Sequence, residues 1–354
     1  TKKTGAEKWL KVDINWADYY NEMYNSSDLV LFTDVENTYS SKSYLSTSIV
    51  TSIAQDDNGM MWFGTKRGLN SFDSYNFEEY NQIDGIINAT ITDIQPVGDT
   101  LFIGTERGLC VYDLKNKRAT NFFKETDSLI LPDNYIHHIT KPINGRITIC
   151  TKGGTTVYDL TTKDFRVPKV SNYFPNYEVR SIVYMPKYDT WWVATSNGLV
   201  SYQDYNQSVR HYYSVEGLNN TLSDSDLRCL FVVDDDNLFI GSTNGLTLLN
   251  IANKEMEVID LNSLTNYYSS RIDVSEIISV SDDEIMISTY SDGLYIYNHK
   301  RKTAVHISKF DRRYAISENY IYDIFKDETG SVWIATFSGL NRLENNLAKF
   351  HTIN

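Results

Sequence analysis

Cysteine, basic charge and long hydrophobic runs are all scarce in this chain of 354 residues, and each scarcity excludes a class of protein. No run of about 18 apolar residues occurs, so the sequence predicts no membrane-spanning helix and no membrane contact. The formal net charge of −13 leaves no basic face for phosphates, so we expect no nucleic-acid partner. The three cysteines, Cys110, Cys150 and Cys229, fit no metal-ligand spacing and are interpreted as packed free thiols. We expect neither a metal nor another cofactor.

Sustained helical periodicity is also lacking after residue 48, and one short phrase occurs seven times in its place. Two of the copies read MMWFGTKRGLNSFD and SVWIATFSGLNRLE. Every copy contains one equivalent glycine, which we call the marker glycine, and successive marker glycines are 40 to 48 residues apart. The marker glycines are Gly68, Gly108, Gly154, Gly198, Gly245, Gly293 and Gly339. A period of this length built from strand-like units predicts a β-propeller.

Each repeat predicts four short strands, a to d in chain order. Strand a holds one large aliphatic residue 14 to 16 positions before the marker glycine, as Ile53 does in the first copy. Strand b carries two adjacent apolar residues, such as Trp62 and Phe63, which indicates a strand that is covered on both faces. The next position is always small, so we expect a neighbouring blade to pack tightly against it. The marker glycine then ends a loop and is expected to adopt a positive φ.

Four strands in each of seven units predict an all-β fold, a seven-bladed β-propeller of four-stranded antiparallel blades, over residues 49–354. Stacking hides the apolar faces that one blade cannot hide alone. Two packed β-sandwiches and a degenerate eighth blade are less favoured alternatives, because the repeat stays in register through seven copies. Residues 1–48 match no repeat and predict an N-terminal extension that covers the junction of the ring or is the remnant of an upstream module. We expect a short helix and a strand within residues 16–32, and the last strand d at residues 349–354.

The repeat W-[IF]-[GA]-T-x-x-G-L, preceded by a D-x-x-G turn and a strand, resembles the two-component regulator propeller repeat. The copies that carry the resemblance best are IVTSIAQDDNGMMWFGTKRGLNSFD and YIYDIFKDETGSVWIATFSGLNRLE. The third copy departs most, with Cys150 in the small position and Thr155 in place of leucine. The resemblance extends over residues 49–354.

The resemblance implies the extracytoplasmic, periplasmic sensor part of a hybrid two-component system, which joins a sensor to a histidine kinase. Many such sensors are implicated in detecting glycan fragments, so an oligosaccharide is the expected ligand. The typical sensor of this family has two seven-bladed propellers followed by an immunoglobulin-like domain. An adjoining propeller or immunoglobulin-like domain, and a second copy in a homodimeric receptor, are therefore the expected partners. A propeller that serves only protein interaction is the alternative.

A ligand is expected on the face where the b–c loops and the d–a loops surround the channel mouth, because long loops on a rigid scaffold are where binding usually evolves. Arginine suits carboxylate or sulfate, asparagine suits sugar hydroxyls and aromatic faces suit sugar rings, so an anionic oligosaccharide is the more specific hypothesis. Solvated loop tips are the alternative interpretation. The candidate residues from the b–c loops are Lys66, Arg67, Glu106, Arg107, Lys152, Asn197, Asn244, Tyr290, Asp292 and Phe337. The candidates from the d–a loops are Arg271, Arg312, Arg313 and Tyr314.

Strand a is expected to line the channel with the residue before its large aliphatic. These residues are Ser52, Asp93, His138, Ser181, Cys229, Glu276 and Asp323. Carboxylates and a histidine around one channel could act as acid and base, which keeps a carbohydrate-active enzyme, such as a sialidase-like hydrolase or a lyase, as a third function. The turn DDNGMMW is similar to the Asp-box turn of sialidase-like propellers, with Asp57 in the acidic position. A water-filled polar lining is favoured, and we expect no catalysis.

Overall fold

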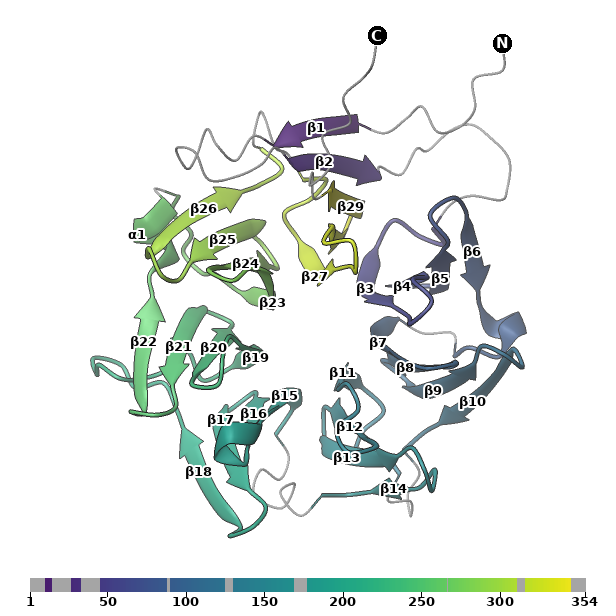
Figure 1. Ribbon diagram of the computed structural model, residues 1–354, viewed down its shortest axis with the longest axis horizontal. Coiled ribbons are helices and arrows are strands. Elements are labelled where there is room, and N and C mark those ends of the chain that lie inside the picture. Colours follow the sequence, from purple (N-terminus) through teal and green to yellow (C-terminus); the bar gives the residue numbers. More distant parts are fainter. Residues whose placement is uncertain are drawn as a thin grey trace.

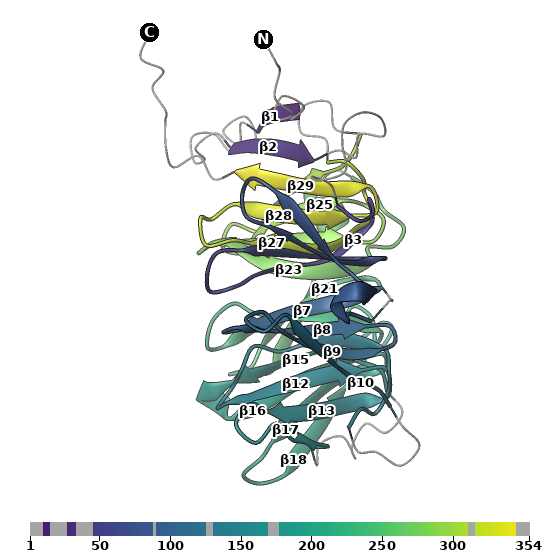
Figure 2. The ribbon, with the colours of Figure 1, turned by 90° about the vertical axis from the view of Figure 1, so that its right-hand side faces the viewer.

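Seven antiparallel sheets surround a central channel in the computed structural model, and the prediction of a seven-bladed β-propeller is confirmed (Figure 1). The structure describes residues 45–87, 90–124, 130–168, 177–265, 267–310 and 316–343, and the backbone of residues 10–14, 27–32 and 344. The innermost strand of each blade faces the channel, and Figure 2 shows the stacked sheets from the side. Blades are numbered here in chain order.

The first three blades each contain strands a to d in chain order from the channel outward. Blade 1 consists of β3 (Val50–Gln55), β4 (Met61–Thr65), β5 (Gly68–Phe72) and β6 (Phe77–Tyr80). Blade 2 consists of β7 (Ile91–Val97), β8 (Thr100–Thr105), β9 (Gly108–Asp113) and β10 (Arg118–Phe122). Blade 3 consists of β11 (Ile136–Ile139), β12 (Arg146–Thr151), β13 (Gly154–Asp159) and β14 (Phe165–Arg166).

The next three blades repeat this order. Blade 4 consists of β15 (Val179–Met185), β16 (Thr190–Thr195), β17 (Gly198–Gln203) and β18 (Ser208–Tyr212). Blade 5 consists of β19 (Leu227–Val232), β20 (Asn237–Ser242), β21 (Gly245–Asn250) and β22 (Glu255–Ile259). Blade 6 consists of β23 (Val274–Ser281), β24 (Glu284–Thr289), β25 (Leu294–Asn298) and β26 (Thr303–Ile307). The short helices of the described residues are α1 (Leu261–Thr265) and the 3₁₀ turns Gln82–Asp84 and Pro186–Tyr188.

Blade 7 is assembled from both ends of the chain. Its inner strands are β27 (Ile321–Lys326), β28 (Val332–Thr336) and β29 (Gly339–Glu344). The strand beside β29 is β2 (Ser27–Phe32), which pairs antiparallel with Leu29 opposite Leu343, and β1 (Leu10–Ile14) lies outside β2. The place expected for the last strand d is thus taken by β2, while residues 349–354 lie outside the described residues. The expected strand within residues 16–32 is present as β2, and the expected helix before it is outside the described residues.

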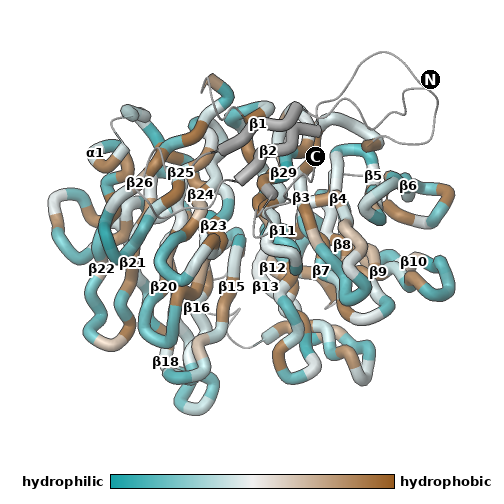
Figure 3. Tube along the Cα trace, turned by 45° about the horizontal axis from the view of Figure 1, so that its top comes forward, coloured by the Kyte–Doolittle hydropathy of each residue, from teal (hydrophilic) through white to brown (hydrophobic). Residues whose placement is uncertain are grey.

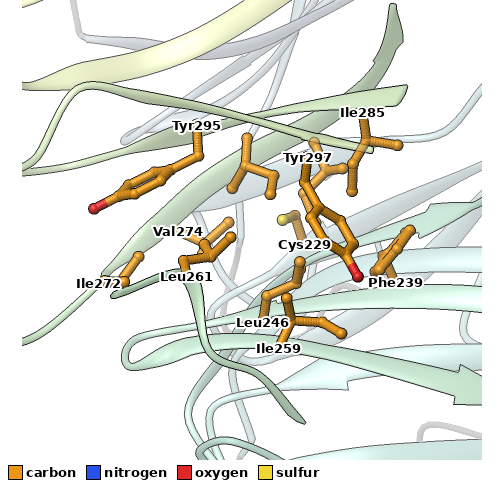
Figure 4. Packing of buried hydrophobic residues seen from close by; sticks show 12 residues of the cluster. Cys229, Phe239, Leu246, Ile259, Leu261, Ile272, Val274, Ile285, Tyr295 and Tyr297 are labelled. Atoms are coloured by element: carbon orange, nitrogen blue, oxygen red, sulfur yellow. The ribbon is translucent and has the colours of Figure 1, made fainter. Parts of the chain in front are cut away.

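The hydrophobic core lies between blades rather than within one centre. Figure 3 shows hydrophobic stretches distributed over the blades. Between blades 5 and 6, for example, Cys229 and Phe239 pack with Val274 and Tyr297 (Figure 4). At six of the seven junctions the large strand-b residue of one blade is buried against the next blade, which contributes roughly 1.5–3 kcal/mol per side chain. Because each blade is covered by its neighbours, the complete ring is stable, whereas an isolated blade would expose its apolar faces.

The small position of strand b is small because the next blade touches it, as expected. A Cβ atom added to Gly64 would lie 2.6 Å from Ile91 of blade 2, and one added to Gly104 would lie 2.7 Å from Ile136 of blade 3. The marker glycines have positive φ values, and at Gly108 a Cβ atom would lie 2.5 Å from the carbonyl oxygen of Phe122. The small strand-b residues allow neighbouring blades to pack closely, and the marker glycine allows the b–c loop to approach strand d of its own blade.

One buried aspartate organises the a–b turn of blade 1. The carboxylate of Asp56 accepts the backbone N–H groups of Asn58 and Met60 at 2.9 and 3.1 Å, and it accepts the indole N–H of Trp62 at 3.0 Å. Asp327 of blade 7 makes the same set of bonds, with Trp333 as the indole donor at 2.8 Å. The sequence comparison with Asp-box turns placed Asp57 in this role, and that assignment is wrong. Asp57 is exposed, while its neighbour Asp56 is buried.

Candidate functional site

A cavity of about 850 Å³ occupies the mouth and upper part of the central channel, and we call it the mouth cavity. Its wall combines b–c loop residues such as Lys66 and Tyr290, d–a loop residues such as Tyr135 and Tyr320, and strand a residues. Loops of both kinds therefore meet at one place, as the propeller pattern predicts. The volume falls within the range of about 300–1,000 Å³ that is typical of small-molecule sites.

Part of the predicted site lines this cavity. The predicted residues found in the lining are Lys66, Glu106, Arg271, Tyr290 and Asp292. The predicted residues described outside the lining are Arg67, Arg107, Lys152, Asn197, Asn244 and Phe337. Arg312, Arg313 and Tyr314 lie outside the described residues.

The cations expected from blades 1 to 3 do not gather in the cavity, since Lys66 alone among them is in the described lining. Lys66 and Glu106 are the first residues of two-residue turns, Arg67 and Arg107 are the second, and all four are exposed. Only the first residue of each of these two turns lies in the described cavity wall. Lys152 instead lies 3.5 Å from the carboxylate of Glu178.

A bulge in the innermost strand of every blade supplies the residues that the sequence analysis missed. The register between strands a and b shifts at one residue in all seven blades. All seven bulge residues line the mouth cavity: Thr51, Thr92, His137, Arg180, Arg228, Ser275 and Tyr322. A bulge re-aims a side chain relative to the regular alternation of a strand. The sequence signal that could have identified these residues is their shared position, two residues before the large aliphatic of strand a. The residue type at this position varies from blade to blade, unlike the repeated core positions.

Two of the bulge residues are arginines that join neighbouring blades. Arg228 binds Asp273 of the next blade with two nitrogen–oxygen distances of 2.9 and 3.1 Å. Arg180 binds Asp226 of the next blade at 2.6 Å and Glu178 of its own blade at 3.1 Å. These pairs hold both guanidinium groups in fixed positions at the cavity wall. The charge of each arginine is balanced locally by a carboxylate.

Four aromatic side chains, Tyr290, Tyr320, Tyr322 and Phe337, form a continuous patch at the rim on blades 6 and 7, which we call the aromatic cluster. Tyr320 lies at its centre, with ring centroids 5.2 Å from Tyr290, 5.0 Å from Tyr322 and 6.2 Å from Phe337. Lys66 stands 5.9 Å from the ring of Phe337, and Arg228 stands 5.5 Å from that of Tyr290. Tyr320 is 39% exposed and Phe337 is 47% exposed. Aromatic area thus faces solvent beside fixed polar groups.

The carboxylates deeper in the channel bind backbone groups of neighbouring blades. Asp93 accepts the backbone N–H of Ile139 in blade 3 at 2.6 Å, and Asp323 accepts that of Ile53 in blade 1 at 2.7 Å. His138 lies 3.0 Å from Asp93. Burial opposes protonation of His138, but the bond to Asp93 and the negative charges of Asp93, Glu276 and Asp323 together outweigh this effect and raise the pKa of His138. Among the described residues, no group of three or more His, Cys, Asp or Glu side chains could hold a metal ion.

Two titrating side chains in the channel wall are shifted in a way that stabilises their neutral forms. Burial raises the pKa of Glu276 from its ordinary value of 4.5 to about 7. Burial, followed by the charge of Arg180, lowers the pKa of His137 to about 4. The three cysteines are buried free thiols, as expected, and burial raises the pKa of Cys110 to about 12.

The raised pKa of Glu276 predicts a pH-dependent stability. Folded protein keeps this proton at pH values where unfolded protein has lost it, so ionisation weakens the fold as the pH rises from about 4.5 to about 7. Replacement Glu276→Gln removes this effect, although His138 and Asp323 still titrate nearby. Relative to the unchanged protein, the variant should gain about 2 kcal/mol of unfolding free energy between about pH 5 and about pH 8. Denaturant titrations across this range measure the difference.

The control for this experiment is Glu79→Gln, because Glu79 is an exposed residue of β6. The stability of this variant should follow that of the unchanged protein at every pH. Parallel stability curves for Glu276→Gln and the unchanged protein would contradict the predicted ionisation.

Two segments of the chain, residues 44–67 and 315–338, match the family model for the two component regulator propeller. Each segment contains an aspartate turn and the following strand b of blade 1 or blade 7. The chain is also 28% identical over 312 residues to histidine kinase P4 of Formosa agariphila, which covers 84% of this chain and 19% of that protein. The chain therefore spans about a fifth of the length of this curated relative.

Solved structures of similar architecture come from B. thetaiotaomicron. The extracellular domain of one hybrid two component system is 25% identical, with a TM-score of 0.73 over 88% of this chain and 42% of that one. A second such domain is 19% identical, with a TM-score of 0.70 over 87% of this chain and 40% of that one, and shows the fold alone. None of the helices in the described residues is both long and apolar enough to span a membrane.

Proposed function

We propose that this propeller, whose repeats belong to the two-component regulator propeller family, is the ligand-sensing part of a hybrid two-component system. Its similarity to extracellular domains of such systems supports a position outside the cytoplasm, in the periplasm. This chain spans 42% of the similar extracellular domain and 19% of the similar kinase, so the proposed kinase output lies in another part of the receptor.

The mouth cavity is the observation that carries the proposed ligand, an oligosaccharide. The exposed faces of Tyr320 and Phe337 offer apolar surface for sugar rings. Fixed carboxylates and guanidinium groups, such as Asp273 and Arg228, can exchange hydrogen bonds with hydroxyl groups. The described lining contains four Lys or Arg and six Asp or Glu side chains, so it favours no strongly anionic ligand.

The proposed role is binding without catalysis. Asp93 and Asp323, two of the three carboxylates considered for an enzyme, are each engaged by a backbone N–H of the neighbouring blade. In the proposed mechanism, an oligosaccharide at the mouth favours one arrangement of this propeller relative to an adjoining propeller, an immunoglobulin-like domain or a second receptor copy. The ligand can shift the equilibrium between the two arrangements only by the difference between its binding free energies for them.

Calorimetric titration with neutral and sulfated oligosaccharides tests this proposal. At least one neutral oligosaccharide should bind, and the double replacement Tyr320→Ala and Phe337→Ala should weaken its binding at least tenfold, which is about 1.4 kcal/mol. The matched control is Tyr75→Ala, because Tyr75 is an exposed tyrosine in the c–d turn of blade 1, away from the mouth. This control should bind as the unchanged protein does.

Other outcomes identify the competing functions. Absence of oligosaccharide binding together with stable self-association would replace the proposal with a protein-interaction propeller. Release of sugar products that stops in Glu276→Gln would replace it with a carbohydrate-active enzyme. Binding that is confined to sulfated oligosaccharides would restore the anionic ligand as the specific hypothesis.

A further inference from the structure

A second cavity, of about 440 Å³, lies between blades 3 and 4, and we call it the seam cavity. Its lining includes Asn144 and Asp189 of the two a–b turns and Asp204 of a c–d turn. In antiparallel blades these turns lie at the opposite strand ends from the b–c loops, so this part of the seam cavity lies toward the face away from the mouth. It shares no lining residue with the mouth cavity among the described residues.

The cavity exists because blade 3 lacks two large side chains that the other six blades possess. The strand register places Thr148 of β12 at the position that blade 1 fills with Trp62. At this position the other blades have Trp62, Phe102, Trp192, Phe239, Met286 and Trp333, all of which pack against the following blade. Thr155 of β13 likewise replaces a leucine that packs against the following blade elsewhere, as Leu69 does in blade 1. Both threonines line the cavity.

Blade 4 turns two unusual aromatic residues toward this space. Trp191 of β16 occupies a position where the other blades have Met61, Leu101, Ile147, Leu238, Ile285 and Val332. Tyr184 of β15 lies two residues after the large aliphatic, a position without an aromatic in any other blade. Their ring centroids are 4.9 Å apart. Trp191 is only partly buried, so it does not fill the volume left by the two threonines of blade 3. Part of its aromatic surface therefore faces the cavity.

Fixed polar groups surround the aromatic wall. Arg146 and Arg166 both bind the carboxylate of Asp159, at 3.2 and 3.3 Å, so their guanidinium groups are held beside the cavity. The hydroxyl of Tyr184 donates to Asp189 at 2.6 Å. Each of these groups can contact two neighbouring hydroxyls at once, because carboxylate and guanidinium are planar and two-pronged. The acids and the two arginines leave no excess of positive charge.

We propose that the seam cavity is a separate binding site for a neutral sugar, whose ring packs on Trp191 while its hydroxyls meet the fixed arginine and aspartate groups. A sugar ring has one apolar face and a polar edge, and this cavity has one aromatic wall and a polar rim. The residues that depart from the repeat pattern, Thr148 and Thr155 of blade 3 and Tyr184 and Trp191 of blade 4, face each other across one blade junction. A binding site formed by two blades requires its distinctive residues at such a junction. This site does not depend on the function proposed for the mouth cavity.

The test uses cellobiose, laminaribiose, mannobiose and diacetylchitobiose at millimolar concentrations, with saturation-transfer NMR as the readout. At least one of them should bind, and Trp191→Ala should weaken that binding at least tenfold. The double variant Tyr320→Ala and Phe337→Ala, which alters the mouth, should keep it. Binding that is lost in the mouth variant and retained in Trp191→Ala would overturn the seam site and leave the mouth site standing. The absence of binding for all four sugars would also overturn it.

A filled cavity provides the second variant, in case Trp191→Ala perturbs folding. The double replacement Thr148→Trp and Thr155→Leu restores the residues of blade 1 at both positions. It should unfold at the same or a higher temperature than the unchanged protein, and it should lose disaccharide binding at the seam. Binding that persists in this variant would overturn the proposal.

Discussion

A chain that begins at residue 45 should lose roughly 3–6 kcal/mol of unfolding free energy. This deletion removes β2, whose residues pair with β29 along five positions from Asp28↔Glu344 to Phe32↔Leu340. Each backbone hydrogen bond contributes about 0.5–1.5 kcal/mol net. The deletion also exposes the edge of β29, and an open edge strand promotes association. Denaturant titration measures the loss, and light scattering detects the expected aggregation.

A shorter deletion separates the effect of β2 from the effect of chain length. Removal of residues 1–26 eliminates β1 but leaves β2 paired with β29. This variant should retain most of the stability, because β1 contacts the ring only through β2 in the sheet order. Equal losses in the two deletions would show that β2 does not close blade 7 in solution.

Replacement Asp56→Ala should lower the free energy of unfolding by about 3 kcal/mol. The carboxylate accepts two backbone N–H groups of the turn and the indole N–H of Trp62, which is 3% exposed. Without an acceptor, a buried donor costs about 1–3 kcal/mol, and the turn loses two further bonds to a charged group. Chemical denaturation gives the loss directly.

The neighbouring residue supplies the matched control. Asp57→Ala alters the same turn by the same chemical change at an exposed side chain, and it should cost less than about 0.5 kcal/mol. Asp327→Ala in blade 7 should cost at least as much as Asp56→Ala, because Asp327 makes the three equivalent bonds and also accepts the hydroxyl of Thr329 at 2.6 Å. A larger loss for Asp57→Ala than for Asp56→Ala would contradict the assignment.

The periodic features of the fold could be predicted because every blade faces the same packing problem. A small residue at the position of Gly64 recurs because neighbouring blades pack closely, and the positive φ at Gly68 recurs because every b–c loop ends in the same kind of turn. The pairing of β2 with β29 could not be predicted in the same way, since SDLVLF reads as one more apolar strand without a partner. β2 pairs with β29 because the ring closes at blade 7, and ring closure depends on all seven blades rather than on the local sequence.

The candidate site was predicted less completely because it depends on local departures from regular strand geometry. A two-residue alternation in strand a places Asp93 and Glu276 toward the channel, and this much was expected. The bulge one residue earlier also turns Arg180 and Tyr322 into the mouth, although alternation would direct them elsewhere. Similarly, Thr155 was recognised as a departure, but its effect depends on Thr148 and on the facing strand of blade 4.

The participation of β2 in blade 7 has a consequence for folding during synthesis. Leu29 leaves the ribosome long before its partner Leu343 has been made. Blades 1 to 6 can form as their strands emerge, but β2 must wait for its partner until β29 has been made. Such distant pairing slows folding and lengthens exposure of an unpaired strand. We therefore expect circular permutants that place β2 directly after β29 to refold faster than the natural order.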